Sequence, residues 1–248
     1  MKVDNILFIN LDHDVLRRKN IESELNNFNL KYVRIPGICG NKGTIRGNPR
    51  RGHVKGNIDG IKYDFKGVMK THSRVGCMLS HLKAIIYAKQ NLKGNTMILE
   101  DDISLSLIEN FAESFGDILK EAPDDWNILK IHCNNSPSIK RLYLKYNAGE
   151  KFSELLNKNV INNSSAGCNI INEKGINALY DKYFDNETKT WVIDEDYVLA
   201  DIVTFYIDKV YTYNKPVCLN FITKSNNYVG ENRAEIKANM CIKTLLNK

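Results

Sequence analysis

The N-terminal part of the chain shows a change of hydrophobic period near residue 12. Residues 5–11 form an apolar run with β-branched side chains, as expected of a buried strand. An acidic turn follows over residues 12–14, and beyond it Ile21, Leu25 and Phe28 recur at helical spacing. The pattern predicts a strand followed by a helix.

The next segments differ in how clearly they predict structure. Residues 32–35 form a short predicted strand that stops at a Pro-Gly pair. Residues 36–74 are rich in glycine and basic side chains and lack sustained periodicity, which indicates a functional loop or a small inserted subdomain. Periodicity returns in a predicted helix over residues 78–91 and a fully apolar strand over residues 96–99.

The second half of the chain continues the alternation. A helix is predicted over residues 107–121, strands over 127–131 and 166–171, and a helix over 173–183. This order is typical of a mainly parallel central sheet flanked by helices. Because 248 residues are enough for one such domain, we expect a single α/β domain over residues 1–248.

Composition narrows the class of protein only slightly. The chain has 43% apolar and 26% charged residues, as a globular domain does, and its net charge of +6 favours anionic ligands or surfaces without choosing among them. Its longest apolar runs fall far short of the roughly 20 residues that a membrane-spanning helix needs. The N-terminus also lacks the pattern of a signal peptide. We therefore expect a cytoplasmic location, or peripheral association with the cytoplasmic face of a membrane.

The cysteines give no sign of a metal site. Six of them are scattered along the chain, without a C-x-x-C pair. None stands at a Cys/His spacing typical of zinc sites. Reduced, mostly buried thiols are therefore expected.

Three consecutive acids, Glu100, Asp101 and Asp102, come directly after the apolar strand at residues 96–99. In open α/β sheets ligands bind outside the carboxyl ends of the strands, so these side chains are expected to face a crevice. Adjacent carboxylates repel one another unless a cation or several donors offset their charge, and Mg²⁺ or Mn²⁺ bridging diphosphate oxygens would do so. A solvated acidic turn is the alternative.

Two further polar groups have both a functional and a structural interpretation. Ser80 and His81 lie early in the helix predicted before the acidic strand, where they would face the same crevice or serve the packing of the helix. Asp194 and Glu195 belong to the acidic segment 192–201. One of them would act as general base toward an acceptor hydroxyl, although acids at the start of a helix are also favoured by its dipole.

Taken together, these segments resemble glycosyltransferase family 25, which contains bacterial lipooligosaccharide galactosyltransferases and collagen hydroxylysine galactosyltransferases. The similar stretches follow the family's order between about residues 5 and 225, and they read ILFINLDHDVLRR, GCMLSHLKAI, MILEDDISL, SAGCNIINEKGINAL, VIDE and KPVCLNFITKS. Their order makes the resemblance more specific than any single motif.

The resemblance implies a GT-A-like nucleotide-diphosphosugar transferase fold, a UDP-sugar donor, usually UDP-galactose, and a Mn²⁺ (or Mg²⁺) requirement. It also implies transfer with inversion to a hydroxyl acceptor on a glycan or a hydroxylysine, and we expect no nucleic-acid partner. By the resemblance, Asn10, Leu11 and Arg17 would lie near the nucleotide. Ser80, His81 and Asp101, which are expected at the same crevice, are further candidates for donor binding. Glu100 and Asp102 would hold the metal and diphosphate, and Asp194 or Glu195 would be the base or an acceptor-binding acid.

The chain departs from the family pattern in three places. Asn220 stands where members often have Gln, and Cys168 replaces an aromatic residue. A basic stretch without a family counterpart would clamp phosphates or an anionic acceptor, or form a solvated loop. It consists of Arg46, Arg50, Arg51, His53 and Lys55.

Two other classes of function fit the same residues. A metal-dependent phosphohydrolase or nuclease also needs clustered acids and a basic face, and it would cleave nucleic acid without any sugar acceptor. A catalytically silent, carbohydrate-binding relative would keep the fold alone. Such a relative would bind a UDP-sugar without hydrolysing it in Mn²⁺.

Overall fold

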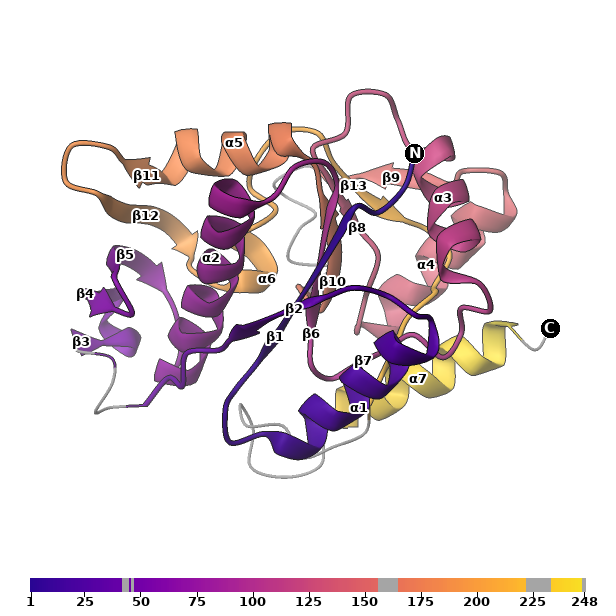
Figure 1. The fold of residues 1–248 in the computed structure, drawn as a ribbon, viewed down its shortest axis with the longest axis horizontal. Coiled ribbons are helices and arrows are strands. Elements are labelled where there is room, and N and C mark those ends of the chain that lie inside the picture. The colour runs from indigo at the N-terminus through magenta and orange to yellow at the C-terminus, as the bar shows by residue number, and fades with distance from the viewer. Residues whose placement is uncertain (42–44, 46, 156–164, 222–232, 247–248) are drawn as a thin grey trace.

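The computed structural model describes residues 1–41, 45, 47–155, 165–221 and 233–246 (Figure 1). In this part of the chain the centre is a seven-stranded sheet in the order β2-β1-β6-β10-β8-β13-β9. Its strands are β1 (Asn5–Asn10), β2 (Val33–Pro36), β6 (Thr96–Glu100), β8 (Ile128–Lys130), β9 (Phe152–Glu154), β10 (Cys168–Ile171) and β13 (Val210–Tyr213).

Two smaller sheets and a set of helices surround this centre. The helices are α1 (Val15–Asn27), α2 (His72–Asn91), α3 (Phe111–Glu121), α4 (Ser136–Asn147), α5 (Glu173–Tyr183), α6 (Ala200–Val203), α7 (Arg233–Leu246) and the short 3₁₀ helix η1 (Pro49–Arg51). The remaining strands are β3 (Gly47–Asn48), β4 (His53–Ile58), β5 (Ile61–Val68), β7 (Ile103–Ser104), β11 (Phe184–Asp185), β12 (Thr190–Tyr197) and β14 (Leu219–Asn220).

The central sheet is mixed, which corrects the expectation of a mainly parallel one. β1 runs parallel to its neighbours β2 and β6, and β13 runs parallel to β8. β10 lies between β6 and β8 and runs antiparallel to both, as β9 does to β13. An alternation of strands and helices along the sequence does not fix the direction in which a later strand enters the sheet, and β10 enters reversed.

Both faces of the central sheet are covered. In β1, Ile6 and Phe8 pack on the face that carries α1 and α3, whereas Leu7 and Ile9 pack on the face that carries α2 and α5. Alternation between two apolar layers is expected of a strand buried on both sides. The unbroken apolar run at the start of the sequence is therefore explained by burial of β1 on both faces.

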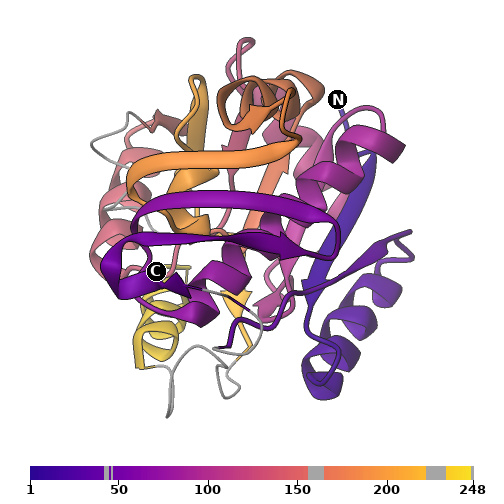
Figure 2. The same ribbon diagram turned by 90° about the vertical axis from the view of Figure 1, so that its left-hand side faces the viewer.

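A second sheet, in the order β11-β12-β5-β4-β3, lies beyond α2 and contributes to the same core (Figure 2). It contains part of the segment 36–74, which holds β3, η1, β4 and β5. In β5 the buried side chains Ile61, Tyr63 and Phe65 alternate with more exposed ones. This period of two is the signal of a half-buried strand. The described part of this segment thus supplies three strands to the second sheet, although it lacked sustained periodicity.

The acidic segment 192–201 lies mostly in a strand rather than at the start of a helix. Val192–Asp196 belong to β12, which pairs in parallel with β5. Asp201 alone stands in the first turn of the short helix α6. Pairing with β5 is a contact between segments far apart in the chain, so the local sequence did not indicate it.

α2 begins at His72, six residues before its predicted start. The side chain of Thr71 caps it by accepting a hydrogen bond from the backbone N–H of Arg74 at 3.4 Å. Ser80 and His81 therefore lie in the middle of the helix and not near its beginning.

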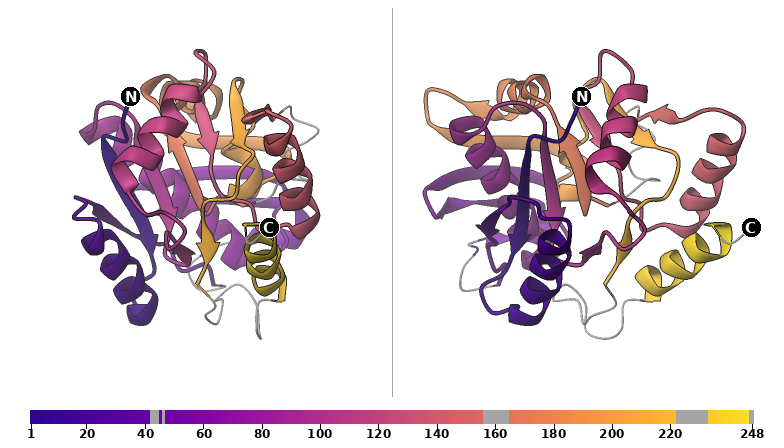
Figure 3. Two further views of the ribbon diagram at one scale, coloured as in Figure 1. Left: turned by 90° about the vertical axis from the view of Figure 1, so that its right-hand side faces the viewer. Right: turned by 45° about the vertical axis from the view of Figure 1, so that its right-hand side comes forward.

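The far end of the molecule is built around α4 and α7, which pack side by side (Figure 3). Near them β14 pairs with β7, the strand that follows the three acids. Of the late stretch 215–225, residues 222–225 lie outside the described part of the chain. None of the described helices is long and apolar enough to cross a membrane.

Candidate active site

A pocket opens at the carboxyl ends of β1 and β6, which are parallel neighbours in the sheet. Parallel pairing brings the end of β1 beside the acids that follow β6, although some ninety residues separate them in sequence. Every residue predicted at the donor or the metal lines this one pocket: Asn10, Leu11, Arg17, Ser80, His81, Glu100, Asp101 and Asp102.

One wall of the pocket is the segment 37–40, which is held against α2. The hydroxyl of Ser80 accepts a hydrogen bond from the N–H of Ile38 at 2.8 Å and donates one to the carbonyl of Gly76 at 2.7 Å. A Cβ on Gly76 would lie 2.5 Å from the carbonyl oxygen of Ile38, so only glycine allows this approach. Ser80 thus fixes this wall of the pocket to α2.

Asp101 is buried and held by two donors. Nδ2 of Asn10 donates to Oδ2 of Asp101 at 2.7 Å, and Nη1 of Arg17 donates to Oδ1 at 3.2 Å. Burial raises the pKa of Asp101 above its ordinary value, although the hydrogen bond from Asn10 and the charge of Arg17 oppose that rise. This carboxylate therefore braces β1 and α1 against β6.

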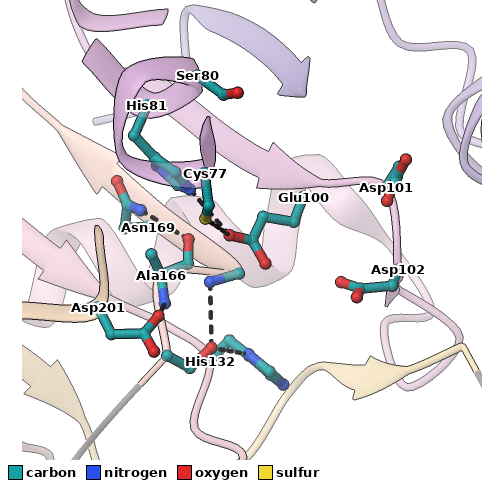
Figure 4. A network of polar contacts seen from close by, with 12 residues as sticks. Cys77, Ser80, His81, Glu100, Asp101, Asp102, His132, Ala166, Asn169 and Asp201 are labelled. Carbon is teal, nitrogen blue, oxygen red and sulfur yellow. Dashed lines mark hydrogen bonds and ion pairs between the residues drawn. The ribbon is translucent and has the colours of Figure 1, made fainter. Parts of the chain in front are cut away.

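Glu100 and Asp102 turn toward the same side of the chain, whereas Asp101 points the other way (Figure 4). Their side chains are 28% and 14% exposed. Nη1 of Arg17 also reaches Oδ2 of Asp102, at 3.4 Å. The triplet thus divides into one carboxylate, Asp101, that braces β1 and α1, and two that turn to the other side of the chain.

Two side chains of α2 contact Glu100. Nε2 of His81 lies 2.9 Å from Oε1 of Glu100 and donates to it, and Sγ of Cys77 donates to the same oxygen at 3.7 Å. Burial would raise the pKa of Glu100, but the hydrogen bond and charge of His81 outweigh it, and the pKa is lowered. Burial, followed by the charge of Glu100, raises the pKa of Cys77 well above its ordinary value. Glu100 is therefore charged and Cys77 is a neutral thiol.

A second polar cluster lies beside Glu100, and the sequence did not reveal it. Lys130 and His132, at and just after the end of β8, are fully buried, and both contact Ser165. Burial lowers the pKa of Lys130 to about 8. Burial and the charge of Lys130 lower the pKa of His132 to about 3, so its imidazole is neutral. A lysine and a histidine two residues apart in an otherwise apolar strand were the available signal.

Asp201 completes this cluster (Figure 4). Its Oδ1 accepts a hydrogen bond from the backbone N–H of Ala166 at 3.0 Å. Burial, followed by the negative charge of Glu100, raises the pKa of Asp201, while Lys130 opposes the rise. Asp201 was noted only as part of an acidic segment, and the structure sets it apart from the other acids there.

Asp194 and Glu195 line a different hollow, between β12 and η1. Asp194 is 73% exposed and lies 3.9 Å from Nζ of Lys66. Glu195 accepts a hydrogen bond from the hydroxyl of Tyr183 at 2.9 Å and lies 3.1 Å from Nζ of Lys182. Neither carboxylate lines the pocket that holds Glu100.

The hollow is lined by side chains of both charges. Arg50 and Arg51 line it opposite the acids of β12. The two sites adjoin at the start of α2, because Thr71 lines the hollow, Ser73 lines the pocket, and their hydroxyls lie 2.9 Å apart.

Two further members of the predicted basic stretch, His53 and Lys55, do not line this hollow. His53 and Lys55 lie on β4, where Nε2 of His53 is 2.8 Å from a carboxylate oxygen of Asp64. Arg46 lies outside the described residues. Of the described members of the stretch, Arg50 and Arg51 thus line the hollow, whereas His53 and Lys55 lie on β4 outside it.

The chain is an α/β protein with a pocket at the carboxyl ends of the parallel strands β1 and β6, where ligands bind in many open α/β sheets. The model of glycosyltransferase family 25 (LPS biosynthesis protein) matches residues 3–199. The chain belongs to this family, which makes a glycosyltransferase with a sugar donor and an acceptor the class of enzyme to expect. No curated protein shows significant similarity to the chain. The matched range contains the whole pocket and ends before Asp201.

Proposed function

We propose that the chain transfers a hexose, with galactose the expected sugar, from a UDP-sugar to a hydroxyl of a glycan or hydroxylysine acceptor. The transfer would be metal-dependent, with inversion at the anomeric carbon, on a GT-A-like version of the α/β fold. The observation that carries the proposal is the shared orientation of Glu100 and Asp102 in a pocket that Asn10, Leu11 and Arg17 also line. Family membership supplies the sugar chemistry.

The two outward carboxylates fit a hard divalent cation such as Mn²⁺. Both His81 and Cys77 contact Oε1 of Glu100, and among the described residues no donor contacts its Oε2. Carboxylate oxygens are the ligands that Mn²⁺ and Mg²⁺ prefer. Glu100 and Asp102 would hold the ion, which when bound would offset negative charge on the diphosphate.

The proposed nucleotide side of the pocket is polar, and its side chains are hydrogen-bonded to one another. Asn10 is fully buried, donates to Asp101 and accepts from Nε of Arg34 at 3.0 Å. Arg17 is held by the carboxylates of Asp101 and Asp102. Its positive charge is already offset by these two carboxylates, so a phosphate bound here would need the further positive charge that a cation at Glu100 and Asp102 would supply.

The mixed-charge hollow beside the pocket is proposed as the acceptor side. It adjoins the pocket at Thr71 and Ser73, so a hydroxyl entering there approaches a donor sugar from a second direction. An inverting transfer needs a carboxylate that takes the acceptor proton on the face opposite the leaving phosphate. Asp194 is exposed and available for this task, whereas Glu195 is held by Tyr183 and Lys182 and suits acceptor binding.

A thermal-shift screen tests the donor half of the proposal. UDP and UDP-sugars, with and without Mn²⁺, are compared with GDP and CMP nucleotides, since a ligand that binds only the folded chain raises its melting temperature. We expect a UDP-specific rise that requires the metal. The hits are then incubated with hydroxylysine peptides and simple glycans, and the product anomer is determined by NMR.

The outcomes separate the three classes of function. Formation of a glycosylated product supports the proposal, and retention of anomeric configuration would contradict its single displacement. Cleavage of nucleic acid without a sugar acceptor would replace it with a nuclease. UDP-sugar binding without any transfer or slow hydrolysis would leave a silent carbohydrate-binding relative.

A further inference from the structure

Three potential metal ligands of different chemistry meet at one point of the pocket. Cys77 and His81 are four residues apart on α2, so their side chains leave the same face of the helix. Glu100 reaches them from the end of β6. Sγ of Cys77, a ring nitrogen of His81 and a carboxylate oxygen of Glu100 all lie within 4.8 Å of one another.

The separations are close to those in a tetrahedral site. Zinc binds sulfur at about 2.3 Å and nitrogen or oxygen at about 2.0–2.2 Å, which places neighbouring ligand atoms roughly 3.3–3.6 Å apart. Here Sγ of Cys77 lies 3.7 Å and Nε2 of His81 lies 2.9 Å from Oε1 of Glu100. A small rotation of the Glu100 side chain would open the shorter distance enough for an ion.

We propose that Cys77, His81 and Glu100 form a site for a thiophilic divalent cation, Zn²⁺ or Co²⁺, with its fourth position open to the pocket. All three residues line the pocket, which gives the ion a path of entry. Cys77 and His81 have the i, i+4 spacing that two histidines have in the H-E-x-x-H zinc motif, although no zinc spacing was recognised here from the sequence. The third ligand, Glu100, lies at the end of β6, nine residues after α2 ends. Only the packing of α2 on β6 brings the set together.

Binding exchanges protons for the ion. The Cys77 thiol would lose its proton to solvent, and so would Nε2 of His81, which leaves a neutral imidazole with its proton on Nδ1. Within the described residues Nδ1 of His81 has no hydrogen-bond partner. The hydrogen bonds that Cys77 and His81 now give to Glu100 would be replaced by three bonds to one ion, so Glu100 keeps a positive neighbour.

The site competes with the proposed donor site, and this consequence rests on the proposed function. Thiolate and imidazole select Zn²⁺ over Mn²⁺, whereas a pair of carboxylates suits Mn²⁺. Because both sites need Glu100, an ion held at its Oε1 by Cys77 and His81 would lie next to one held by its Oε2 and Asp102, and two dications this close repel each other. Zn²⁺ would therefore inhibit transfer even when Mn²⁺ is present in excess.

Titration of the full chain with Co²⁺, in the absence of nucleotide, tests the site itself. A thiolate bound to Co²⁺ gives a charge-transfer band in the near ultraviolet, and tetrahedral geometry gives intense visible bands. We expect both to saturate at one ion per chain and to vanish when one equivalent of Zn²⁺ is added. Absence of the charge-transfer band in the wild-type chain would overturn the proposal.

A matched pair of variants identifies the thiol. Cys39 is exposed and lines the same pocket, so Cys39→Ser is the control for Cys77→Ser. The charge-transfer band should persist in Cys39→Ser and disappear in Cys77→Ser. Loss in Cys39→Ser, or persistence in Cys77→Ser, would assign the ion to another sulfur and refute the site.

A measurement on the wild-type chain covers the case in which Cys77→Ser does not fold. X-ray absorption at the zinc edge should show one sulfur neighbour together with nitrogen or oxygen neighbours, and a shell without sulfur would exclude Cys77. These readouts need no sugar transfer. A chain that binds Co²⁺ in this way but neither UDP nor Mn²⁺ would refute the proposed function alone, and the converse result would refute the cation site alone.

Discussion

Nη1 of Arg17 lies 3.2 Å from Oδ1 of Asp101, and both side chains are about nine-tenths buried. The pair joins α1 to the end of β6, and the same guanidinium reaches Asp102. Removing one member of a buried pair leaves the other charge without compensation, which is far more costly than losing a surface pair. Arg17 is therefore expected to matter for the fold as well as for the ligand.

Replacing Arg17 by Met should destabilise the chain by about 3–5 kcal/mol at pH 7, because Asp101 would stay buried without its cation. The pKa of Asp101 is already raised by burial, and loss of Arg17 would raise it further. A raised folded-state pKa means stability that is present at low pH and lost as pH rises through that pKa. The deficit of the variant should thus shrink from pH 7 toward pH 4 in urea unfolding.

The neighbouring Arg18 provides the control for this change. It makes an exposed pair with Glu22 one turn along α1. Arg18→Met should unfold close to the wild type at both pH values. Equal losses in the two variants, or an Arg17→Met deficit that is independent of pH, would contradict the bracing role of Arg17.

Asp102→Ala should abolish transfer while leaving the fold intact. Loss of one of two carboxylates that hold the cation should remove several kcal/mol of charge stabilisation, or roughly a hundredfold or more in kcat. Arg17 keeps Asp101 as a partner, so the melting temperature should change little. Asp124, which is exposed and remote from the pocket, provides the control Asp124→Ala. Near-normal turnover of Asp102→Ala in excess Mn²⁺ would remove Asp102 from the site.

Two glycines in helices should respond oppositely to alanine. At Gly76 a Cβ would lie 2.5 Å from the carbonyl oxygen of Ile38, so Gly76→Ala should push residues 37–40 away from α2. At Gly116 in α3 the nearest atom is 3.7 Å away, and alanine should stabilise the helix by about 0.5–1 kcal/mol. The free energy of unfolding and the affinity for UDP should both fall in Gly76→Ala, and neither should fall in Gly116→Ala. Unchanged UDP binding in a folded Gly76→Ala chain would show that this wall does not shape the donor site.

Lys130 should impose a pH dependence on stability. Its pKa is lowered by burial from 10.5 to about 8, so between these values the unfolded chain binds more protons and stability rises with pH. Lys130→Met removes this contribution. Its stability relative to wild type should fall between pH 7.5 and pH 10, by on the order of 2–3 kcal/mol. Guanidinium unfolding at both pH values measures it.

The exposed Lys19 on α1 supplies the comparison, because Lys19→Met removes a lysine without removing a buried one. Its pH profile should follow that of the wild type. A Lys130→Met profile parallel to the wild type would mean that Lys130 titrates as an ordinary lysine and that its burial has no electrostatic effect.

Asp194→Asn tests the acceptor side. If Asp194 takes the acceptor proton, kcat/KM for the acceptor should fall roughly a hundredfold or more, while binding of UDP with Mn²⁺ is unchanged. Because Asp194 lines the hollow and not the pocket around Glu100, its loss should affect the acceptor and leave donor binding unchanged. Asp208→Asn, at an exposed and distant position, is the control. Normal acceptor kinetics in Asp194→Asn would show that another group is the base, and Asp201, which is buried and feels the charge of Glu100, would be tested next.

Local sequence was sufficient to predict those helices and strands whose buried side chains recur with the period of a helix or a strand. The helix predicted over residues 173–183 has the same bounds as α5, and the apolar runs before residue 12 and residue 100 became β1 and β6. The position of Glu100–Asp102 at a strand end followed from that pattern alone. These features depend on side chains a few residues apart, so hydrophobic spacing reports them directly.

Other features were decided by contacts between distant segments. The reversed direction of β10, the pairing of β12 with β5 and the separate hollow around Asp194 depend on which strands meet, and no local period encodes that choice. The sequence by itself determined that three acids would lie at the carboxyl end of a buried strand. Tertiary packing alone decided that Arg17 would hold Asp101 and that α2 would set a thiol and an imidazole against Glu100. The physical reason is that each of these contacts joins segments far apart in the sequence, whose meeting depends on the packing of whole elements and not on the spacing of residues along the chain.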